Sequence, residues 1–222
     1  MSEKLIIKTL NGREIYDEYA RQSITAIQSQ INDILYKVIE ITSFSNNIGT
    51  AEMGSTVNNV TLTWGCNKTP TALTLDGSTI DASATSKSLT SLGLTTNKTW
   101  TLIARDERDA TSQKTTSLNF YNGIYYGVAV AGTYDSNFIL ALTKVLSNTR
   151  ARTISVNAGT NQNIYYCLPT RLGTPSFNVG GFDGGFKKVS TISFTNSSGY
   201  SENYDIWKSD NTNLGNVSVK IS

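Results

Sequence analysis

The feature that most constrains this fold is a row of β-branched residues near the N-terminus, spaced alternately by three and by four positions. Such spacing marks the a and d positions of a coiled coil, which face a partner helix. β-Branched residues at both positions favour three or four helices over two. We therefore predict a homotrimeric helical neck over residues 20–41. Its seam consists of Ile24, Ile27, Ile31, Ile34, Val38 and Ile41.

An amphipathic helix packed on its own domain would also carry an apolar stripe. Two observations favour the neck: the spacing is strict, and no other segment of the chain has a helical pattern to act as a partner. A seam this short is marginal by itself, because short isolated helices are barely stable in water. The domains that follow must therefore help to hold the three chains together.

Composition excludes several classes of function. The 222 residues include no histidine, which removes the commonest general base and the commonest metal ligand. Only 16% of the residues are charged, and the formal net charge is +2, with no basic run that would indicate a nucleic-acid partner. The first ten residues lack the apolar region of a signal peptide, and no run is long enough to cross a membrane. We predict a protein that is not an enzyme, binds no cofactor or metal, and is assembled in a cytoplasm without membrane insertion.

The fold class predicted for the rest of the chain is mainly β. Residues 42–121 hold short segments separated by polar turns, such as the alternating Val60–Trp64 and Leu73–Leu75 before Asp76-Gly77. This spacing indicates an immunoglobulin-like or fibronectin III-like β-sandwich. We expect Trp64 and Trp100 in its core, one from each sheet.

Residues 122–222 predict a second antiparallel β-sandwich, which we expect to be jelly-roll-like. The pair Asn122-Gly123 marks the boundary between the two sandwiches. The strands expected after it are Tyr125–Ala131, Phe138–Leu146, Arg152–Val156, Ile164–Leu168, Val189–Phe194, Tyr204–Trp207 and Val217–Ile221.

Local motifs each have a structural and a functional interpretation. The glycine-rich Val179–Phe186 lacks the context of a phosphate-binding loop and predicts tight bends between strands. The charged run Arg105–Asp109 could hold Ca²⁺, but two arginines lie among its acids, which favours a solvated hairpin tip. Cys66 and Cys167 could form a disulfide, although we expect two ordinary thiols. The candidate carboxylates for glycoside hydrolysis, which no spacing distinguishes, are Asp183, Glu202 and Asp205.

Aromatic residues concentrate in residues 122–222. Adjacent strand positions point to opposite faces, so one ring of Tyr125-Tyr126 and one of Tyr165-Tyr166 should lie in the core and the other outward. Outward rings could stack on a sugar or pack at a subunit interface, and the sequence favours neither. The candidate ligand-binding residues are Tyr166, Tyr200 and Asn211.

Several segments, taken in their order along the chain, resemble those of a known protein family. These segments are LNGREIYD (10–17), VTLTW (60–64), LTLDG (73–77), KTWTL (98–102), FYNGIYYG (120–127) and TNSSGY (195–200). Together they resemble structural proteins of bacteriophage fibres and baseplates, including tail and head fibres. The resemblance implies a homotrimeric virion protein whose residues 1–41 dock to other virion proteins and whose last domain faces outward.

Two functions follow from these observations as hypotheses. The first is a virion structural protein that mediates attachment to a host surface glycan or protein through residues 122–222. The second is a carbohydrate-binding surface module without a virion role, against which the missing export signal argues. An enzyme carried on a fibre is disfavoured because the chain has no histidine.

Overall fold

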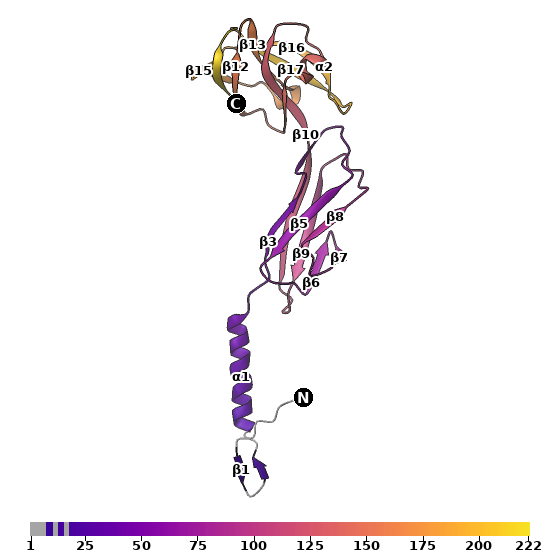
Figure 1. The fold of residues 1–222 in the computed structure, drawn as a ribbon, viewed down its shortest axis with the longest axis vertical. Helices are drawn as coiled ribbons and strands as arrows, with labels where there is room; N and C mark the ends of the chain where they lie inside the picture. Colours follow the sequence, from indigo (N-terminus) through magenta and orange to yellow (C-terminus); the bar gives the residue numbers. More distant parts are fainter. Residues whose placement is uncertain (1–7, 11–12, 16–17) are drawn as a thin grey trace.

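The computed structural model describes residues 8–10, 13–15 and 18–222. A helix, an elongated β-sandwich and a broader C-terminal β-structure follow one another along the long axis of the molecule (Figure 1). Strands β1 (Lys8–Leu10) and β2 (Arg13–Ile15) pair antiparallel before the helix. The other residues of the predicted docking segment before Glu18 lie outside the described part of the chain.

Helix α1 (Glu18–Leu35) is shorter than the predicted neck. Val38 lies in the connection after the helix, and Ile41 begins strand β3 (Ile41–Asn46), where it is fully buried. The prediction of a helical seam through residue 41 is therefore wrong for these two residues. Val38, Ile39 and Ile41 are β-branched, which favours extended backbone over a further helical turn. Four isoleucines of the seam remain on α1.

Residues 39–120 contribute to one hydrophobic core between two sheets. The smaller sheet has the strand order β3-β5-β8, and the facing part of the larger sheet has the order β10-β9-β6-β7. Strand β4 runs parallel to β10. This is the strand order of an immunoglobulin-like sandwich. The strand bounds are β4 (Thr50–Glu52), β5 (Val60–Cys66), β6 (Ala72–Leu75), β7 (Ser78–Ile80), β8 (Ser86–Leu89), β9 (Lys98–Arg105) and β10 (Thr111–Val130).

Two tryptophans from opposite sheets lie in this core. Trp64 on β5 is 5% exposed and Trp100 on β9 is 2% exposed. The indole N–H of Trp64 donates a hydrogen bond to the carbonyl of Ala84 at 2.8 Å, so its burial leaves no unpaired donor. The prediction of one core tryptophan from each sheet is confirmed.

Strand β10 belongs to both β-structures. Its first part pairs with β9, and beyond the sandwich it pairs with β11 (Thr143–Ser147) and β13 (Gln162–Pro169). Phe120 lies in the sandwich core and Ile124 in the next core, so the core changes where Asn122-Gly123 predicted a boundary. The strand nevertheless continues through this pair without a turn. One extended backbone therefore joins the two β-structures.

The C-terminal part has two antiparallel sheets and a helical cover. The larger sheet has the order β16-β17-β13-β10, with β11 also paired to β10, and the smaller has the order β12-β18-β14-β15. In three cases, β10-β11, β14-β15 and β16-β17, two consecutive strands pair antiparallel in the same sheet, so the order is not the expected jelly roll, which is built from two Greek keys. The remaining strand bounds are β12 (Arg152–Ala158), β14 (Phe177–Val179), β15 (Phe182–Asp183), β16 (Phe186–Thr195), β17 (Ser201–Ser209) and β18 (Gly215–Ile221).

Helix α2 (Ser136–Leu140) takes the place of the first three residues of the predicted strand Phe138–Leu146. The side chain of Asp135 caps this helix by accepting a hydrogen bond from the N–H of Phe138 at 2.8 Å. Ile139 of α2 packs on the face of the larger sheet that is turned away from the smaller sheet. Strand β13 is consequently buried on both faces.

Candidate functional site

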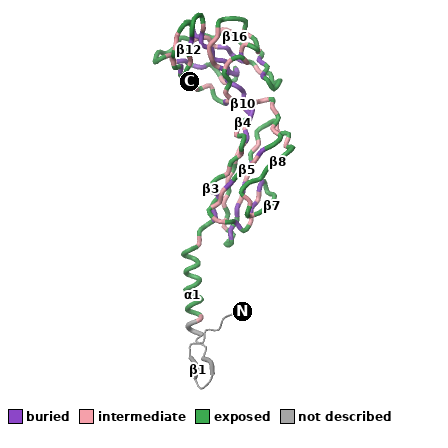
Figure 2. Tube along the Cα trace, in the orientation of Figure 1, coloured by how far each residue is buried: buried purple, intermediate pink, exposed green. Residues whose placement is uncertain are grey.

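The first candidate site is the apolar stripe on α1. Ile24, Ile27 and Ile34 are 52%, 55% and 82% exposed, and Ile31 is 42% exposed. Figure 2 shows that α1 is exposed from Gln22 to Leu35. The interpretation of this helix as a segment packed on its own domain is therefore wrong. These four isoleucines therefore form an apolar stripe that no other described part of the chain covers.

The helix is held to the sandwich by Asp106, in the turn between β9 and β10. Asp106 is 1% exposed, and its Oδ2 accepts hydrogen bonds from the Tyr36 hydroxyl at 2.7 Å and the Ile39 N–H at 3.1 Å. Its Oδ1 accepts from the N–H groups of Arg108 and Ala110. Burial alone would raise the pKa of Asp106, but hydrogen bonds from Tyr36 and the Arg108 backbone outweigh it and hold that pKa well below its usual range.

Two cations complete this junction. Arg108 forms an ion pair with Asp33 of α1 at 2.8 Å, and its guanidinium lies 4.1 Å from the centroid of the Tyr36 ring. Lys68 forms an ion pair with Asp106 at 3.1 Å. The run Arg105–Asp109 is the exposed hairpin tip that we predicted, except that Asp106 is buried and that Asp106 and Arg108 bind the end of the helix segment. Among the described residues, no group of three acidic or cysteine side chains could hold a metal ion.

The three candidate ligand residues predicted from the sequence are not brought together. Tyr166 is fully buried, and its hydroxyl donates to the carbonyl of Arg150 at 2.6 Å. Burial raises the pKa of Tyr166 to about 12. The prediction of an outward Tyr166 is wrong because both faces of β13 are covered. Tyr165, its neighbour, is fully buried on the other face.

Tyr200 and Asn211 lie at opposite ends of the C-terminal part. The backbone of Tyr200 packs against Gly54 of the sandwich, where an added Cβ would lie 2.6 Å from the Tyr200 Cβ. Its side chain is 37% exposed. Asn211 is exposed in the turn after β17, and its carbonyl accepts from the side chain of Asn163 at 3.2 Å. Asn163 pairs with Ala129 near the end of β10, so Asn211 lies at the end away from the sandwich.

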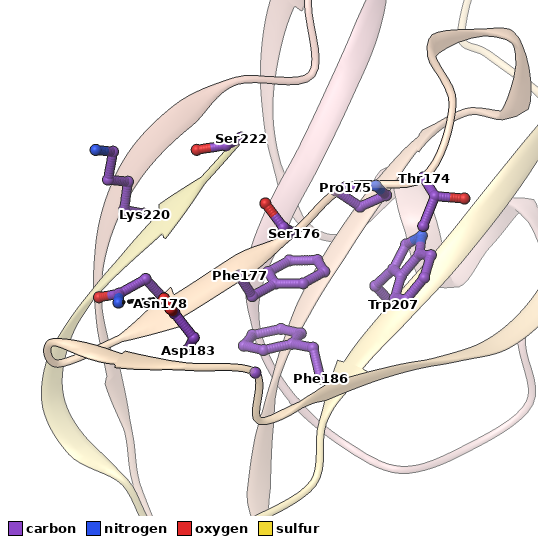
Figure 3. Close-up of a pocket in the computed structure, with 11 residues that line it drawn as sticks. Thr174, Pro175, Ser176, Phe177, Asn178, Asp183, Phe186, Trp207, Lys220 and Ser222 are labelled. Carbon is purple, nitrogen blue, oxygen red and sulfur yellow. Dashed lines mark hydrogen bonds between the residues drawn. The ribbon is translucent and has the colours of Figure 1, made fainter.

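A second candidate site, which the sequence did not reveal, is a pocket of about 650 Å³ between the edges of the two C-terminal sheets. The rings of Phe177 and Phe186 stack in it with centroids 4.1 Å apart and planes 6° apart. The Trp207 ring lies 5.6 Å from Phe177 (Figure 3). The pocket is lined by Thr174, Pro175, Ser176, Phe177, Asn178, Asp183, Gly184, Phe186, Trp207, Lys220 and Ser222.

The glycine-rich segment builds one side of this pocket. Strands β14 and β15 form a hairpin whose glycines have positive φ, a conformation that other residues rarely adopt. Gly184 and Gly185, at φ 99° and 77°, turn the chain back so that Phe186 reaches Phe177. The predicted tight bends are confirmed. The sequence signal for the pocket was this glycine run between aromatic residues.

Polar groups line the side of the pocket opposite Trp207 (Figure 3). The Asn178 amide donates to Oδ1 of Asp183 at 2.7 Å and accepts from the N–H of Gly181 at 3.1 Å. Lys220 projects from β18 on the same side. Neither Asp183 nor Lys220 has an ion-pair partner among the residues that the structure describes.

The candidate carboxylates for glycoside hydrolysis are dispersed. Glu202 pairs with Arg171 at 2.8 Å near the sandwich. Asp205 is 5% exposed and accepts hydrogen bonds from Thr170 and Thr191. Of these three carboxylates, only Asp183 lines the pocket.

Cys66 and Cys167 are free thiols, as expected. No described helix is long and apolar enough to span a membrane.

No protein-family model matches this chain, and no curated protein shows a significant match. Solved structures give weak likenesses. The N-terminal eight Ig domains of Down Syndrome Cell Adhesion Molecule align over 81% of this chain and 26% of that chain, with 8% identity and a TM-score of 0.26. Chitinase ChiA74 from Bacillus thuringiensis aligns over 82% and 26%, with 12% identity and a TM-score of 0.26.

A third likeness is to SGBP-B of the Bacteroides ovatus mixed-linkage glucan utilization locus, solved with a mixed-linkage heptasaccharide. It covers 78% of this chain and 53% of that chain, with 14% identity and a TM-score of 0.19. The chain thus spans between about a quarter and about half of the length of these three chains.

Proposed function

We propose that the protein is a homotrimeric structural component of a bacteriophage virion, in a tail fibre, baseplate or head fibre, and that its C-terminal part attaches the particle to a host surface. The observation that carries this proposal is the exposed isoleucine stripe on a helix at one end of an elongated chain. β-Branched residues at both seam positions suit three helices. The segment resemblance to phage fibre proteins supplies the virion context.

The contacts at the two junctions support a spike in which the parts of each chain keep a fixed orientation. The hydrogen bond from Tyr36 to Asp106 orients α1 against the sandwich, and the continuous strand β10 connects the sandwich to the C-terminal part. At the second junction Lys144 pairs with Glu52 at 2.9 Å, and the Asn196 amide donates to the carbonyl of Met53 at 2.8 Å. Three parallel helices would therefore place three C-terminal parts at the same end.

Attachment can be tested with the full-length chain. Purified protein added in excess should compete with phage particles for adsorption to susceptible cells, and antibodies against residues 122–222 should label intact particles. The variant Ile27→Asn/Ile34→Asn is the matched control, because both side chains are exposed in the single chain and their loss should affect only association. Absence of the protein from particles would overturn the virion role.

A second candidate function is a carbohydrate-binding surface module without a virion role. The aromatic pocket favours it, because such pockets are common features of ligand-binding proteins. The two functions differ in their prediction for α1, since a module of this kind needs no trimer. A monomeric protein that binds saccharide and is absent from particles would favour the module.

A further inference from the structure

We propose that the pocket of Phe177, Phe186 and Trp207 binds a neutral saccharide. This inference rests on the proposed attachment function and names the ligand class and the site. The volume of about 650 Å³ lies within the range of about 300–1,000 Å³ usual for small-ligand pockets. The pocket is also made by elements of both C-terminal sheets, so its walls are fixed by the fold.

The apolar part of the pocket suits the carbon face of a sugar ring. Phe186 and Trp207 are half-buried, so part of each ring faces the pocket, whereas Phe177 is 6% exposed and its ring contacts both of them. Aromatic surfaces gain free energy when they are covered by an apolar face, and a pyranose presents such a face of C–H groups. The Phe177–Phe186 stack fixes the position of Phe186 before any ligand arrives.

The polar part of the pocket suits the hydroxyl rim of the same ring. In Figure 3 the stacked phenylalanines lie between Trp207 on one side and Asn178 with Asp183 on the other. Oδ1 of Asp183 is held by Asn178, which orients the carboxylate so that Oδ2 can accept hydrogen bonds from hydroxyls. Lys220, on the same side, can donate to hydroxyl or ring oxygens.

The charges of the pocket select against other ligand classes. Asp183 and Lys220 carry opposite formal charges, so together they give the pocket no net charge with which to attract a phosphate, a polyanion or a cation. A purely apolar ligand would desolvate the Lys220 ammonium and Oδ2 of Asp183 without offering either group a hydrogen bond, which is unfavourable. A neutral polyhydroxyl compound satisfies both groups, because each hydroxyl is a donor and an acceptor.

Intrinsic fluorescence offers a direct test on the full-length protein. Trp64 and Trp100 are buried in the sandwich, so a ligand in the pocket should change the emission of Trp207. The probes are neutral oligosaccharides built from glucose, galactose, mannose, rhamnose or N-acetylglucosamine, each titrated to its solubility limit. At least one should change the emission saturably. Asp183→Ala and Lys220→Ala should each weaken that binding about tenfold, the effect of losing a hydrogen bond to a charged group.

Two exposed residues outside the pocket provide matched controls. Asp210→Asn removes a carboxylate in the turn after β17, and Phe182→Ser removes an aromatic ring that is 80% exposed on the β14–β15 hairpin. Both variants should bind the saccharide as the native protein does. The proposal is overturned if no probe changes the emission, or if the probe that does so binds Asp183→Ala and Lys220→Ala with native affinity.

This test separates the pocket from the proposed function. A trimeric protein that is present on particles but binds no probe would overturn the saccharide site and leave the fibre role. Saccharide binding by a protein that is monomeric would support the pocket and overturn the trimer. The Ile27→Asn/Ile34→Asn variant should retain single-site binding, because the pocket is remote from α1 (Figure 1).

Discussion

The hydroxyl of Tyr36 donates a hydrogen bond to Oδ2 of Asp106 at 2.7 Å, joining the first residue after α1 to the turn between β9 and β10. The Tyr36 ring also lies 4.5 Å from Nζ of Lys68 and 4.1 Å from the guanidinium carbon of Arg108. One aromatic side chain thus contacts Arg108 and the Asp106 carboxylate of this turn, and also Lys68 from the connection between β5 and β6. The connection between helix and sandwich is therefore specified by side chains.

Replacing Tyr36 should loosen this connection without unfolding the sandwich. In Tyr36→Phe the ring remains for the two cations, but Asp106 loses its side-chain donor from the helix end. We expect a wider distribution of angles between α1 and the sandwich in electron micrographs, with little change in circular dichroism. Tyr200→Phe, at the far junction, should leave the distribution unchanged. An unaltered distribution in Tyr36→Phe would show that this hydrogen bond does not orient the helix.

The stability of the sandwich should fall at low pH through Asp106. Its pKa in the folded protein is well below that of an unfolded aspartate, which is about 3.9. The folded state therefore binds fewer protons, and the free energy of unfolding rises with pH. The contribution is fully present above about pH 5 and is lost as the pH falls below about 4 towards the folded pKa.

Thermal unfolding between pH 2 and pH 6 measures this dependence. In Asp106→Asn the change of melting temperature with pH should be smaller than in the native protein. It should not vanish, since Asp76 and Asp81 also have lowered pKa values. Equal pH dependence in the two proteins would contradict the assignment to Asp106.

Gly123 should be needed where β10 passes between the two cores. A Cβ at this position would lie 2.6 Å from Cε2 of Tyr125, whose side chain is 1% exposed and cannot move freely. We expect Gly123→Ala to destabilise the protein by about 1–3 kcal/mol in denaturant unfolding. Gly132→Ala is the control, because no atom lies within 4 Å of its added Cβ. Equal stability of the two variants would contradict the close packing at Gly123.

Each core tryptophan should contribute strongly to the stability of the sandwich. Trp64→Ala and Trp100→Ala should each lower the free energy of unfolding by about 3–5 kcal/mol, through lost burial and a residual cavity. Chemical denaturation followed by far-ultraviolet circular dichroism provides the measurement. A loss below 1 kcal/mol in either variant would show that the site collapses around the smaller side chain or that the ring is not packed as described.

The sequence predicted those parts of the fold that depend on local periodicity. Alternation around Trp64 placed its ring in the core, because one face of each sandwich sheet is solvated. The rule that alternate residues of a strand point inward and outward failed at Tyr166, because it assumes a sheet with one buried face. In β13 the second face is covered by a layer that includes Ile139 of α2. The strand prediction overlooked the helix cap at Asp135, and with it this helix.

Other features depend on contacts between distant segments. The sequence around Ile41 is compatible both with a seam position of a coiled coil and with a core position of β3. Only the packing of the sandwich decides between these two places. The glycine run correctly predicted bends, but the sequence could not show that the bends bring Phe186 onto Phe177 next to Trp207. The pocket joins residues from β14, β16, β17 and β18, whose pairing no local pattern specifies.

The mass of the native protein in solution tests the account most directly. Light scattering on the full-length chain should give three times the 24.2 kDa of one chain. Ile27→Asn/Ile34→Asn should lower this mass while leaving the circular dichroism of the β-structure intact, because both isoleucines are solvent-exposed in the single chain. A native mass of 24.2 kDa at every concentration tested would contradict the trimer, and with it the proposed spike.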